Sequence, residues 1–356
     1  MSQVERVAVL FGGVSGEHEV SVNSGRAVAA ALTEAGYTVV PIYIDRGGRW
    51  LLSDGESEVM LRQEGRLLVL GGDHCSEVER VDVVFPVLHG TIGEDGTVQG
   101  LLEILEVPYV GSGVLGSAVG MDKIVMKRLF AQAELLTTEF VGTTRHQVAR
   151  HGPALVAEVE GTVGYPCFVK PANLGSSVGV SKARTRAELL AALDLAARYD
   201  RRLLIERGID GREIEVGVLG NDEPVASVVG EVLPGREFYD YVAKYGDAGS
   251  ETVVPAPIDS RTALLVRDMA VRAYLALDLA GMARVDFLLE RRTGALYLSE
   301  VNTIPGFTNI SMYSKLWHAS GLGFPQLVAR LVELAKERAV DRRLSLSAAR
   351  EAHVAV

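Results

Sequence analysis

The sequence has few cysteines and no long apolar run, and each absence narrows what the protein can be. Its 356 residues include only two cysteines, Cys75 and Cys167, which form neither a C-x-x-C pair nor a disulfide framework. A reduced, cytoplasmic protein is therefore expected. No run of 18 or more uncharged apolar residues occurs, so no membrane span is predicted. The first residues lead directly into a strand-like run, without the pattern of a signal peptide.

The sequence also lacks an excess of positive charge. The formal net charge is −10 at pH 7, which argues against nucleic acid as the main partner. Small anionic ligands stay compatible with this charge, because a site can be locally basic on an acidic protein. The chain has no internal repeat or low-complexity segment, and its length suits two or three domains.

The most informative stretch, residues 281–309, reads as a β-hairpin. Apolar runs at residues 285–289 and 295–301 lie on either side of a turn. Because side chains alternate between the two faces of a strand, Arg284 and Asp286 share one face.

The second strand brings Glu300 and Asn302 to a common face in the same way. Together with Asp286 they would form a set of oxygen ligands that suits a hard cation such as Mg²⁺ or Mn²⁺. Asp286 must then pair with Glu300, which requires a turn with an odd number of residues or a bulge, because a one-residue slip reverses the faces. The alternative is a solvated hairpin face with ordinary surface charges.

The N-terminal part has the pattern of a doubly wound α/β domain. A buried-type strand at residues 7–11 is followed by a glycine-rich turn and then by a helical pattern. Glu17 lies in this turn and could hold an ammonium group, with helix capping or exposure to solvent as the alternative. His89 follows an apolar strand at residues 81–88, and open α/β sheets bind ligands at the carboxyl ends of their strands.

Further elements are predicted between these landmarks and just beyond them. A helix that starts near residue 122 carries Lys123 and Lys127, and the first domain boundary is expected near residue 120. The other predictions for this part are a strand at 37–44, an irregular segment at 46–80, a helix at 101–106 and a short strand at 108–111.

The middle of the chain carries a candidate phosphate-binding loop. A strand at residues 165–170 ends at Lys170, and a Gly/Ser loop with Ser176 and Ser177 follows. A lysine beside such a loop can hold phosphate oxygens through its charge and through the loop N–H groups and hydroxyls. A simple hairpin turn is the alternative. Beyond a helix at 188–198, the exit of a strand near residue 206 is a place where an adenine ring could meet backbone polar groups.

Residues 234–255 show no clean period, and such long loops are often lids over a site. They carry Tyr239, Lys244 and Tyr245, which could close over a phosphate and exclude water. A mobile surface loop is the alternative. The remaining predictions are helices at 258–277 and 324–340 and a frayed tail at 341–356.

Nine short motifs follow one another along the chain. They are G-G-x-S-x-E-x-E-V-S at 12–21, H-G-x-x-G-E-D-G at 89–96, G-S-G at 111–113, M-D-K at 121–123, K-P-A-N-L-G-S-S-V-G at 170–179, F-Y-D-Y at 238–241, A-K-Y at 243–245, R-x-D at 284–286 and E-V-N-T-x-P-G at 300–306. In this order the motifs resemble the D-alanine–D-alanine ligase family of the ATP-grasp superfamily, and the resemblance covers residues 5–337.

The resemblance implies an enzyme that joins two D-alanines with ATP through an acyl phosphate, for the synthesis of peptidoglycan precursors. It implies ATP and two Mg²⁺ or Mn²⁺ ions as cofactors, and a homodimer. The implied ATP-grasp fold has an N-terminal Rossmann-like domain at 1–121 for the first D-alanine, a central subdomain at 122–212 with the phosphate loop, and a C-terminal subdomain at 213–340 with the lid, the metal site and the second D-alanine site.

The resemblance also implies roles for single residues. The metal ligands would be Asp286, Glu300 and Asn302. The phosphates would be bound by Lys123, Lys170, Ser176, Ser177 and Lys244. Adenosine would be bound by Glu206, Arg207, Ile209 and Glu213.

For the two amino acids, the resemblance implies that Glu17 holds the first ammonium group, with His89 nearby, and that Ser311 binds the second carboxylate. Arg284 and the N–H of Gly306 would stabilise the tetrahedral oxyanion. The remaining implied roles are a hydrogen-bonded triad of Glu17, Ser176 and Tyr245, and Tyr239 or the acyl-phosphate oxygens as acceptor of the amine proton.

Two other functions stay open at this point. Related ligases use D-lactate or D-serine as the second substrate, and the D-lactate enzymes carry a histidine where this chain has Tyr245, which favours D-alanine. A catalytically idle nucleotide-binding module is disfavoured, because such a module has no physical use for the intact set of Lys170, Arg284, Asp286 and Glu300.

Overall fold

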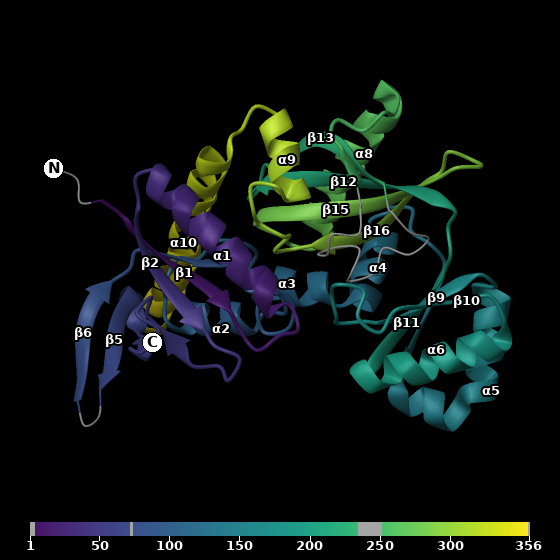
Figure 1. Ribbon diagram of the computed structural model, residues 1–356, viewed down its shortest axis with the longest axis horizontal. Coiled ribbons are helices and arrows are strands. Elements are labelled where there is room, and N and C mark those ends of the chain that lie inside the picture. The colour runs from purple at the N-terminus through teal and green to yellow at the C-terminus, as the bar shows by residue number, and fades with distance from the viewer. Residues whose placement is uncertain (1–3, 72–73, 234–250, 355–356) are drawn as a thin grey trace.

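The computed structural model describes residues 4–71, 74–233 and 251–354. Within these residues the chain is a mixed α/β fold whose strands gather into four sheets, with helices packed against them. Figure 1 shows the N-terminal elements at the left, the strands β9 to β11 with their helices at the lower right, and the strands β12 to β16 above.

The N-terminal sheet is covered by helices on both faces, as the doubly wound pattern predicts. Strand β1 pairs in parallel with β2 and with β7, and β3 adds an antiparallel edge. Val7 and Val9 of β1 face a core shared with α1 and α10, whereas Ala8 and Leu10 face a core shared with α2. The elements are β1 (Arg6–Gly12), α1 (His18–Glu34), β2 (Thr38–Ile44), β3 (Trp50–Leu51), β7 (Val83–Pro86), α2 (Thr97–Ile104), α3 (Val114–Met121) and α10 (Phe324–Val354).

The segment 46–80, which the sequence predicts to be irregular, contains a small antiparallel sheet as well as β3. The sheet has the order β4-β5-β6 and consists of β4 (Val59–Leu61), β5 (Arg66–Gly71) and β6 (His74–Arg80). Its strands are short, and much of β6 is charged and exposed, so the sequence lacks a clear alternation. Leu61 and Leu67 nevertheless pack into the core beneath β1. The strand predicted at 108–111 is also absent, since Tyr109 forms only an isolated bridge with Val84.

The central part is a four-stranded antiparallel sheet with two helices packed on it. Its order is β10-β9-β11-β8, and Leu189, Leu193 and Val159 form the core between the sheet and the helices. The elements are α4 (Lys123–Gln132), β8 (Phe140–Thr144), α5 (Arg145–Thr162), β9 (Cys167–Pro171), β10 (Ser181–Ala183), α6 (Arg186–Tyr199) and β11 (Arg202–Arg207).

The C-terminal part is built on a five-stranded antiparallel sheet in the order β14-β13-β12-β15-β16. Helix α8 packs on one face of this sheet, and α9 packs against β12 and β13. The elements are β12 (Gly211–Gly220), β13 (Val225–Leu233), β14 (Glu251–Val253), α8 (Ser260–Ala276), β15 (Gly281–Glu290), β16 (Leu296–Asn302) and α9 (Met312–Ala319).

The hairpin of β15 and β16 has the predicted pairing of Asp286 with Glu300, and it reaches that pairing through a bulge. Near the turn, Leu289 pairs with Leu296 and Phe287 with Leu298. Continued without interruption, this register would pair Asp286 with Ser299. Ser299 is instead the extra residue of a bulge, because the register shifts between Asp286 and Phe287. The bulge returns Glu300 to the face of Asp286.

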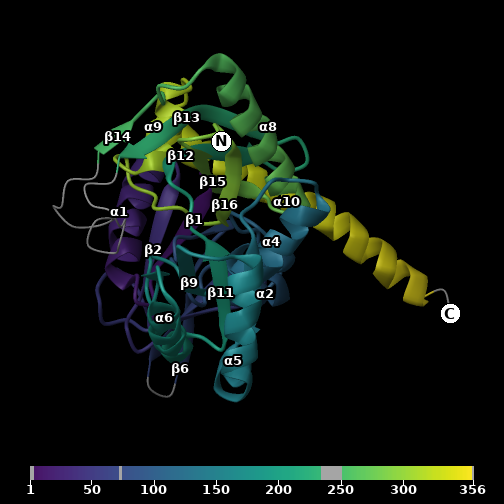
Figure 2. The same ribbon diagram turned by 90° about the vertical axis from the view of Figure 1, so that its right-hand side faces the viewer.

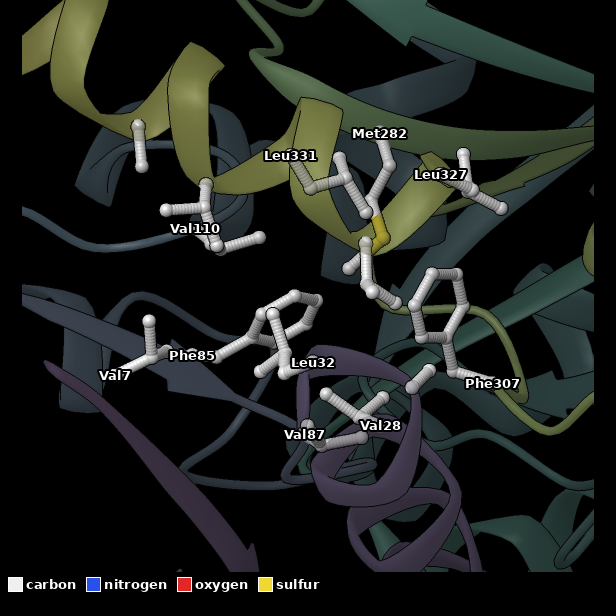
Figure 3. Close-up of a cluster of buried hydrophobic side chains, with 14 of the residues drawn as sticks. Val7, Val28, Leu32, Phe85, Val87, Val110, Met282, Phe307, Leu327 and Leu331 are labelled. Carbon is white, nitrogen blue, oxygen red and sulfur yellow. The ribbon is translucent and has the colours of Figure 1, made fainter. Parts of the chain in front are cut away.

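Helix α10 joins the end of the chain to its beginning. Leu327 and Leu331 of α10 belong to one buried cluster with Val28 and Leu32 of α1 and Phe85 of β7, which Figure 3 shows. The helix continues to Val354 and extends beyond the body of the molecule in Figure 2, where the sequence predicts a frayed tail after residue 340. The reason is local: residues 341–354 are rich in alanine, arginine and leucine and contain no glycine or proline.

No helix in the described part of the chain is both long enough and apolar enough to span a membrane.

Candidate active site

One face of the C-terminal sheet gathers an arginine and several side chains with oxygen atoms. The Nε and Nη2 atoms of Arg284 donate to the two carboxylate oxygens of Asp286, each at 2.7 Å. The Nδ2 atom of Asn302 donates to Asp286 at 2.9 Å. Arg284 Nε also lies 3.1 Å from the carboxylate of Glu215, the cross-strand neighbour of Asp286 on β12. The sheet therefore brings together Arg284, Asp286 and Asn302 as the sequence predicts, with Glu215 in addition.

Arg284 is held in its charged form. Burial by itself would lower the pKa of this guanidinium, but the charges of Asp286 and Glu215 outweigh it and raise the pKa well above its ordinary value. Arg284 therefore supplies a permanent positive charge beside the hairpin face.

The donor set fits a hard divalent cation. Asp286 and Glu300 provide carboxylate oxygens on one face of paired strands, and Asn302 provides an amide. Among the described residues, no group of three or more His, Cys, Asp and Glu side chains is placed to hold a metal by itself. Two carboxylates and an amide would leave coordination positions for phosphate oxygens and water, which is how Mg²⁺ is usually bound beside polyphosphates.

Lys123 connects the hairpin to the Gly/Ser loop. Asp122 caps helix α4 by accepting from the N–H groups of Ile124 and Val125, and this fixes the direction in which Lys123 leaves the helix. The ammonium of Lys123 donates to the carbonyl of Leu174 at 2.9 Å and lies 3.6 Å from Glu300. A phosphate binding beside Lys123 would thus be close to both segments.

A buried glutamate holds two lysines of the central part. Glu206 on β11 accepts from Lys170 at 2.6 Å through one carboxylate oxygen and from Lys127 at 2.8 Å through the other. Thr138 also donates to it at 2.9 Å. Lys127 is fully buried, whereas the side chain of Lys170 is 20% exposed. Lys170 is therefore the partly exposed lysine, whereas Lys127 neutralises Glu206 inside the protein.

The environment keeps Glu206 ionised. Burial alone would raise the pKa of this carboxyl, but the charges and hydrogen bonds of Lys127 and Lys170 outweigh it and lower the pKa far below its usual range. Both oxygens of the carboxylate are therefore occupied by the lysines. Contact between Glu206 and adenosine stays a prediction.

The other predicted adenosine residues lie at the same strand exit. Arg207 donates to the Tyr297 hydroxyl at 2.9 Å and lies 2.7 Å from Glu139, so its charged end is directed toward those residues. Ile209 is half-buried between β11 and β12. Burial by itself would lower the pKa of Lys170, but the charges of Glu206 and Glu300 raise it, and Glu213 is close enough to add to that effect.

Glu17 and Ser176 join the N-terminal part to the Gly/Ser loop. The hydroxyl of Ser176 donates directly to the carboxylate of Glu17. The same carboxylate lies against two glycines, since an added Cβ would come within 2.6 Å of it at Gly90 and within 3.0 Å at Gly175. Ser176 and Ser177 both have the left-handed backbone that favours glycine, with φ of 51° and 58°. The loop is thus held in an unusual conformation with Glu17 against it.

His89 and the segment after β16 meet inside the molecule. His89 is 4% exposed, and its Nδ1 atom lies 3.0 Å from the carbonyl oxygen of Ile304. Beyond Ile304, Gly306 approaches Ser311, whose Oγ atom would be 3.5 Å from an added Cβ on the glycine. The Ser311 hydroxyl also accepts from the N–H of Thr308 at 3.0 Å. Gly306 and Ser311, to which the resemblance gives separate roles, are therefore neighbours.

Three predicted site residues, Tyr239, Lys244 and Tyr245, lie outside the described residues, and so does the part of the predicted lid at 234–250. The rest of that segment contains strand β14.

The comparisons with known proteins agree on one family. The model of the D-ala D-ala ligase N-terminus matches residues 6–112, and the model of the D-ala D-ala ligase C-terminus matches residues 129–333. The D-alanine--D-alanine ligase of Heliobacterium modesticaldum is 49% identical over 348 residues, covering 94% of this chain and 95% of the relative. The chain belongs to the D-alanine–D-alanine ligase family.

Other ligases of this family and related structures support the same assignment. The D-alanine--D-alanine ligase of Geobacillus thermodenitrificans is 48% identical and covers 95% of this chain and 97% of its own. The D-alanine-D-alanine ligase structure from Coxiella burnetii superposes with a TM-score of 0.84 at 33% identity, covering 100% of both chains. The VanG D-Ala:D-Ser ligase of Enterococcus faecalis also has a TM-score of 0.84, at 35% identity, covering 94% of this chain and 100% of its own.

Reasoning from the sequence assigns no role to three residues that the structure places around the site: Lys127, Glu94 and Glu215. Lys127 stands four residues after Lys123, which is the spacing of one helix face, and this is the signal that could have found it. Glu94 lies within the H-G-x-x-G-E-D-G motif and accepts from backbone N–H groups on both sides of the site. Glu215 gives no sequence signal, because only the pairing of β12 with β15 brings it to Arg284.

We predict that Lys127→Met lowers the free energy of unfolding by about 3–5 kcal/mol, because Glu206 loses one of two buried cationic partners. The measurement is urea unfolding at pH 7, with Arg128→Met as control, since Arg128 is exposed on the same helix. The lowered pKa of Glu206 means that its ion pairs add stability above the ordinary glutamate pKa of about 4.3 and lose it as the pH falls. The difference from wild type should therefore shrink at about pH 4, and equal unfolding midpoints at pH 7 would contradict the prediction.

Proposed function

We propose that the residues brought together by the three parts of the chain form the complete site of an ATP-dependent D-alanine–D-alanine ligase. As a member of this family, the chain is an enzyme that joins two D-alanines into D-alanyl-D-alanine through an acyl phosphate, for the synthesis of peptidoglycan precursors. The family uses ATP and divalent metal ions. The proposal concerns how this chain's own residues carry out the reaction.

The metal site is proposed at Asp286, Glu300 and Asn302, with two Mg²⁺ or Mn²⁺ ions. Bound ions would neutralise the negative charge that builds up on the phosphates during phosphoryl transfer. The contribution of the chain is to keep three oxygen-bearing side chains on one face of β15 and β16. What supports this is the chemistry of the ligand set and its short separation from Lys123.

Phosphate binding is proposed for Lys123, Lys170 and the loop of Ser176 and Ser177, with Lys244 added from the segment at 234–255. The ammonium of Lys170 is held by Glu206 at 2.6 Å, so it is fixed in place before a nucleotide binds. The adenosine is proposed to lie at the exit of β11, against Glu206, Arg207, Ile209 and Glu213.

The first D-alanine is proposed to bind with its ammonium group at Glu17, beside His89. Ser176 then couples the presence of this substrate to the phosphate loop, because it donates to the same carboxylate. In the family triad the third member is Tyr245, and Tyr239 or the acyl-phosphate oxygens would accept the proton of the attacking amine.

The second D-alanine is proposed to bind through its carboxylate at Ser311, next to Gly306. As its amine attacks the acyl carbon, negative charge develops on the carbonyl oxygen. Arg284 and the Gly306 N–H would stabilise that charge, and one such donor typically lowers the barrier by about 2.7–4 kcal/mol. Arg284 can do so at any working pH because its flanking carboxylates keep it charged.

The proposed division of labour follows the chain. Residues 1–121 bind the first D-alanine, residues 122–212 carry the phosphate loop, and residues 213–340 carry the lid, the metal site and the second D-alanine site.

Because the reaction consumes ATP, we propose that the protein works in the cytoplasm. Recovery of the ligase activity in a membrane or secreted fraction of fractionated cells would argue against this location.

A single observation carries the proposal. Arg284, Asp286, Glu300 and Asn302 share one face of the hairpin, and Lys123 connects that face to the loop of Ser176. A binding module that transferred no phosphoryl group would gain nothing from this concentration of opposed charges.

The direct test is phosphate release from ATP in the presence of Mg²⁺ and D-alanine. We expect release that depends on D-alanine, together with D-alanyl-D-alanine as the product. D-serine and D-lactate serve as alternative acceptors in parallel reactions, because the chain also resembles a D-Ala:D-Ser ligase. Preferential ligation of D-serine or D-lactate would move the assignment to that neighbouring specificity, and release without any amino acid would contradict ligation.

We predict that Arg284→Ala lowers kcat by about 10²–10³-fold while ATP still binds, because the reaction loses a donor to the developing oxyanion and Asp286 loses its arginine partner. Calorimetry with ATP and Mg²⁺ measures binding, and the phosphate assay measures turnover. Arg284→Lys retains the charge and keeps Glu215 and Asp286 neutralised, so it separates a catalytic loss from a folding defect. Near-normal turnover of Arg284→Ala would show that the oxyanion role is wrong.

We propose that the protein is a homodimer and that α2 and α3 form the contact. Both helices expose apolar side chains that a single chain would leave in water, Ile104 being 73% exposed and Leu115 60%. Ile104→Asp should therefore give a species with half the wild-type mass in light scattering. Leu264→Asp is the control, because Leu264 is 64% exposed on α8. A monomeric wild type would overturn this proposal.

A further inference from the structure

The turn that carries Gly306 is anchored by the side chains on either side of it. Ile304 is 4% exposed and Phe307 is fully buried, and both belong to the core shared by α1 and α10. Figure 3 shows Phe307 among the side chains of that core. Gly306 lies between these anchors and is itself half-exposed. Among the residues that the structure describes, no group accepts a hydrogen bond from its N–H.

Three side chains from the N-terminal part hold the backbone of the same turn. The Nδ1 atom of His89 donates to the carbonyl oxygen of Ile304 at 3.0 Å. The N–H of Ile304 donates to Glu94 at 3.1 Å. The N–H of Phe307 donates to the hydroxyl of Ser24, on α1, at 3.2 Å. The backbone of the turn is therefore hydrogen-bonded at Ile304 and at Phe307, on either side of Gly306.

The three side chains are also linked to one another. The hydroxyl of Ser24 lies 3.0 Å from Nε2 of His89, and Glu94 accepts from the N–H of Gly90, the residue after His89, at 2.7 Å. A carbonyl can only accept, so the proton of a neutral His89 ring is on Nδ1. Burial lowers the pKa of His89 and keeps the ring neutral. Nε2 is then the acceptor for the Ser24 hydroxyl, which in turn accepts from the N–H of Phe307.

We propose that Ser24, His89 and Glu94 are positioning residues that hold the turn so that the Gly306 N–H is aligned with the oxyanion of the reaction. This inference rests on the proposed role of Gly306. It gives His89 a task that uses both of its ring nitrogens within the protein, in addition to its place near the first D-alanine. It gives the fully buried Ser24 a part in the reaction without contact with either substrate.

Ser24 offers the cleanest test, because it is fully buried. Any effect of its hydroxyl on the reaction must pass through the turn or through His89. Ser21 provides a matched control on the same helix. It is also fully buried, and its hydroxyl bonds to Gly12 N at 2.8 Å and to Val87 O at 2.5 Å, without contacting the turn.

The experiment compares Ser24→Ala with Ser21→Ala in the D-alanine-dependent phosphate assay and in thermal unfolding. Misplacing a catalytic group by about 1 Å can cost about 10²-fold in rate. We therefore expect Ser24→Ala to lower kcat by about 10- to 100-fold, with the KM for ATP changed by less than about twofold. Ser21→Ala should show a similar fall in Tm with kcat close to wild type. Ser24→Thr, which keeps the hydroxyl, should recover most of the lost kcat.

A second variant keeps the test decisive if Ser24→Ala fails to fold. Glu94→Leu has a similar volume but no acceptor, so it releases the N–H groups of both Gly90 and Ile304 whatever the protonation state of the carboxyl. It should also lower kcat with little change in the KM for ATP. If both folded variants keep wild-type kcat, or if Ser21→Ala loses as much kcat as Ser24→Ala, the positioning role is wrong. A wild-type protein without D-alanine-dependent turnover would instead contradict the proposed function.

Discussion

The register between β15 and β16 determines which side chains meet at the site. Because a strand alternates its faces, a shift of one residue would carry Glu300 and Asn302 to the opposite side of the sheet. The bulge at Ser299 prevents this by absorbing one residue between Leu298 and Glu300. Arg284 and Asp286 then face the two side chains of β16. The proposed metal site, the oxyanion donor and the contact with Lys123 all depend on that pairing.

Around this hairpin, buried carboxylates hold the positively charged side chains that line the proposed site. Glu206 is surrounded by Lys127, Lys170 and Thr138, and Lys170 is the lysine whose side chain is partly exposed. Arg284 lies between Glu215 and Asp286 in the same manner. In both places a buried carboxylate fixes the position of a cation before any ligand arrives. Such preorganisation reduces the rearrangement that the reaction itself would require.

The sequence predicts much of the site because its chemistry is carried by short local motifs. Asp286, Glu300 and Asn302 follow from strand alternation, and Lys170 follows from its place before the Gly/Ser loop. Alternation could not show whether a turn or a bulge sets the register, since both satisfy the same pattern. Glu215 and Ser24 could not be predicted from the sequence for another reason. Glu215 is paired with Arg284, and Ser24 is hydrogen-bonded to Phe307, and each partner is at least 60 residues away along the chain.

The fold is predicted less evenly than the site. Strands with clear apolar runs, such as β1 and β2, lie where the pattern indicates. The sheet of β4, β5 and β6 was hidden by short strands and exposed charges, and its existence depends on packing against the core beneath β1. Helix α10 exceeds its predicted end because helix propensity continues beyond the apolar pattern that marks its packed portion.

The course of α10 has a consequence for how the chain folds during synthesis. One face of the first sheet is covered by Leu327, Val328 and Leu331, which are made more than 300 residues after Val7 and Val9. While the ribosome is still adding the central and C-terminal parts, that face has α1 but lacks its second helix. The N-terminal part therefore cannot complete its core as an autonomous unit. It reaches its final packing only when nearly the whole polypeptide has emerged.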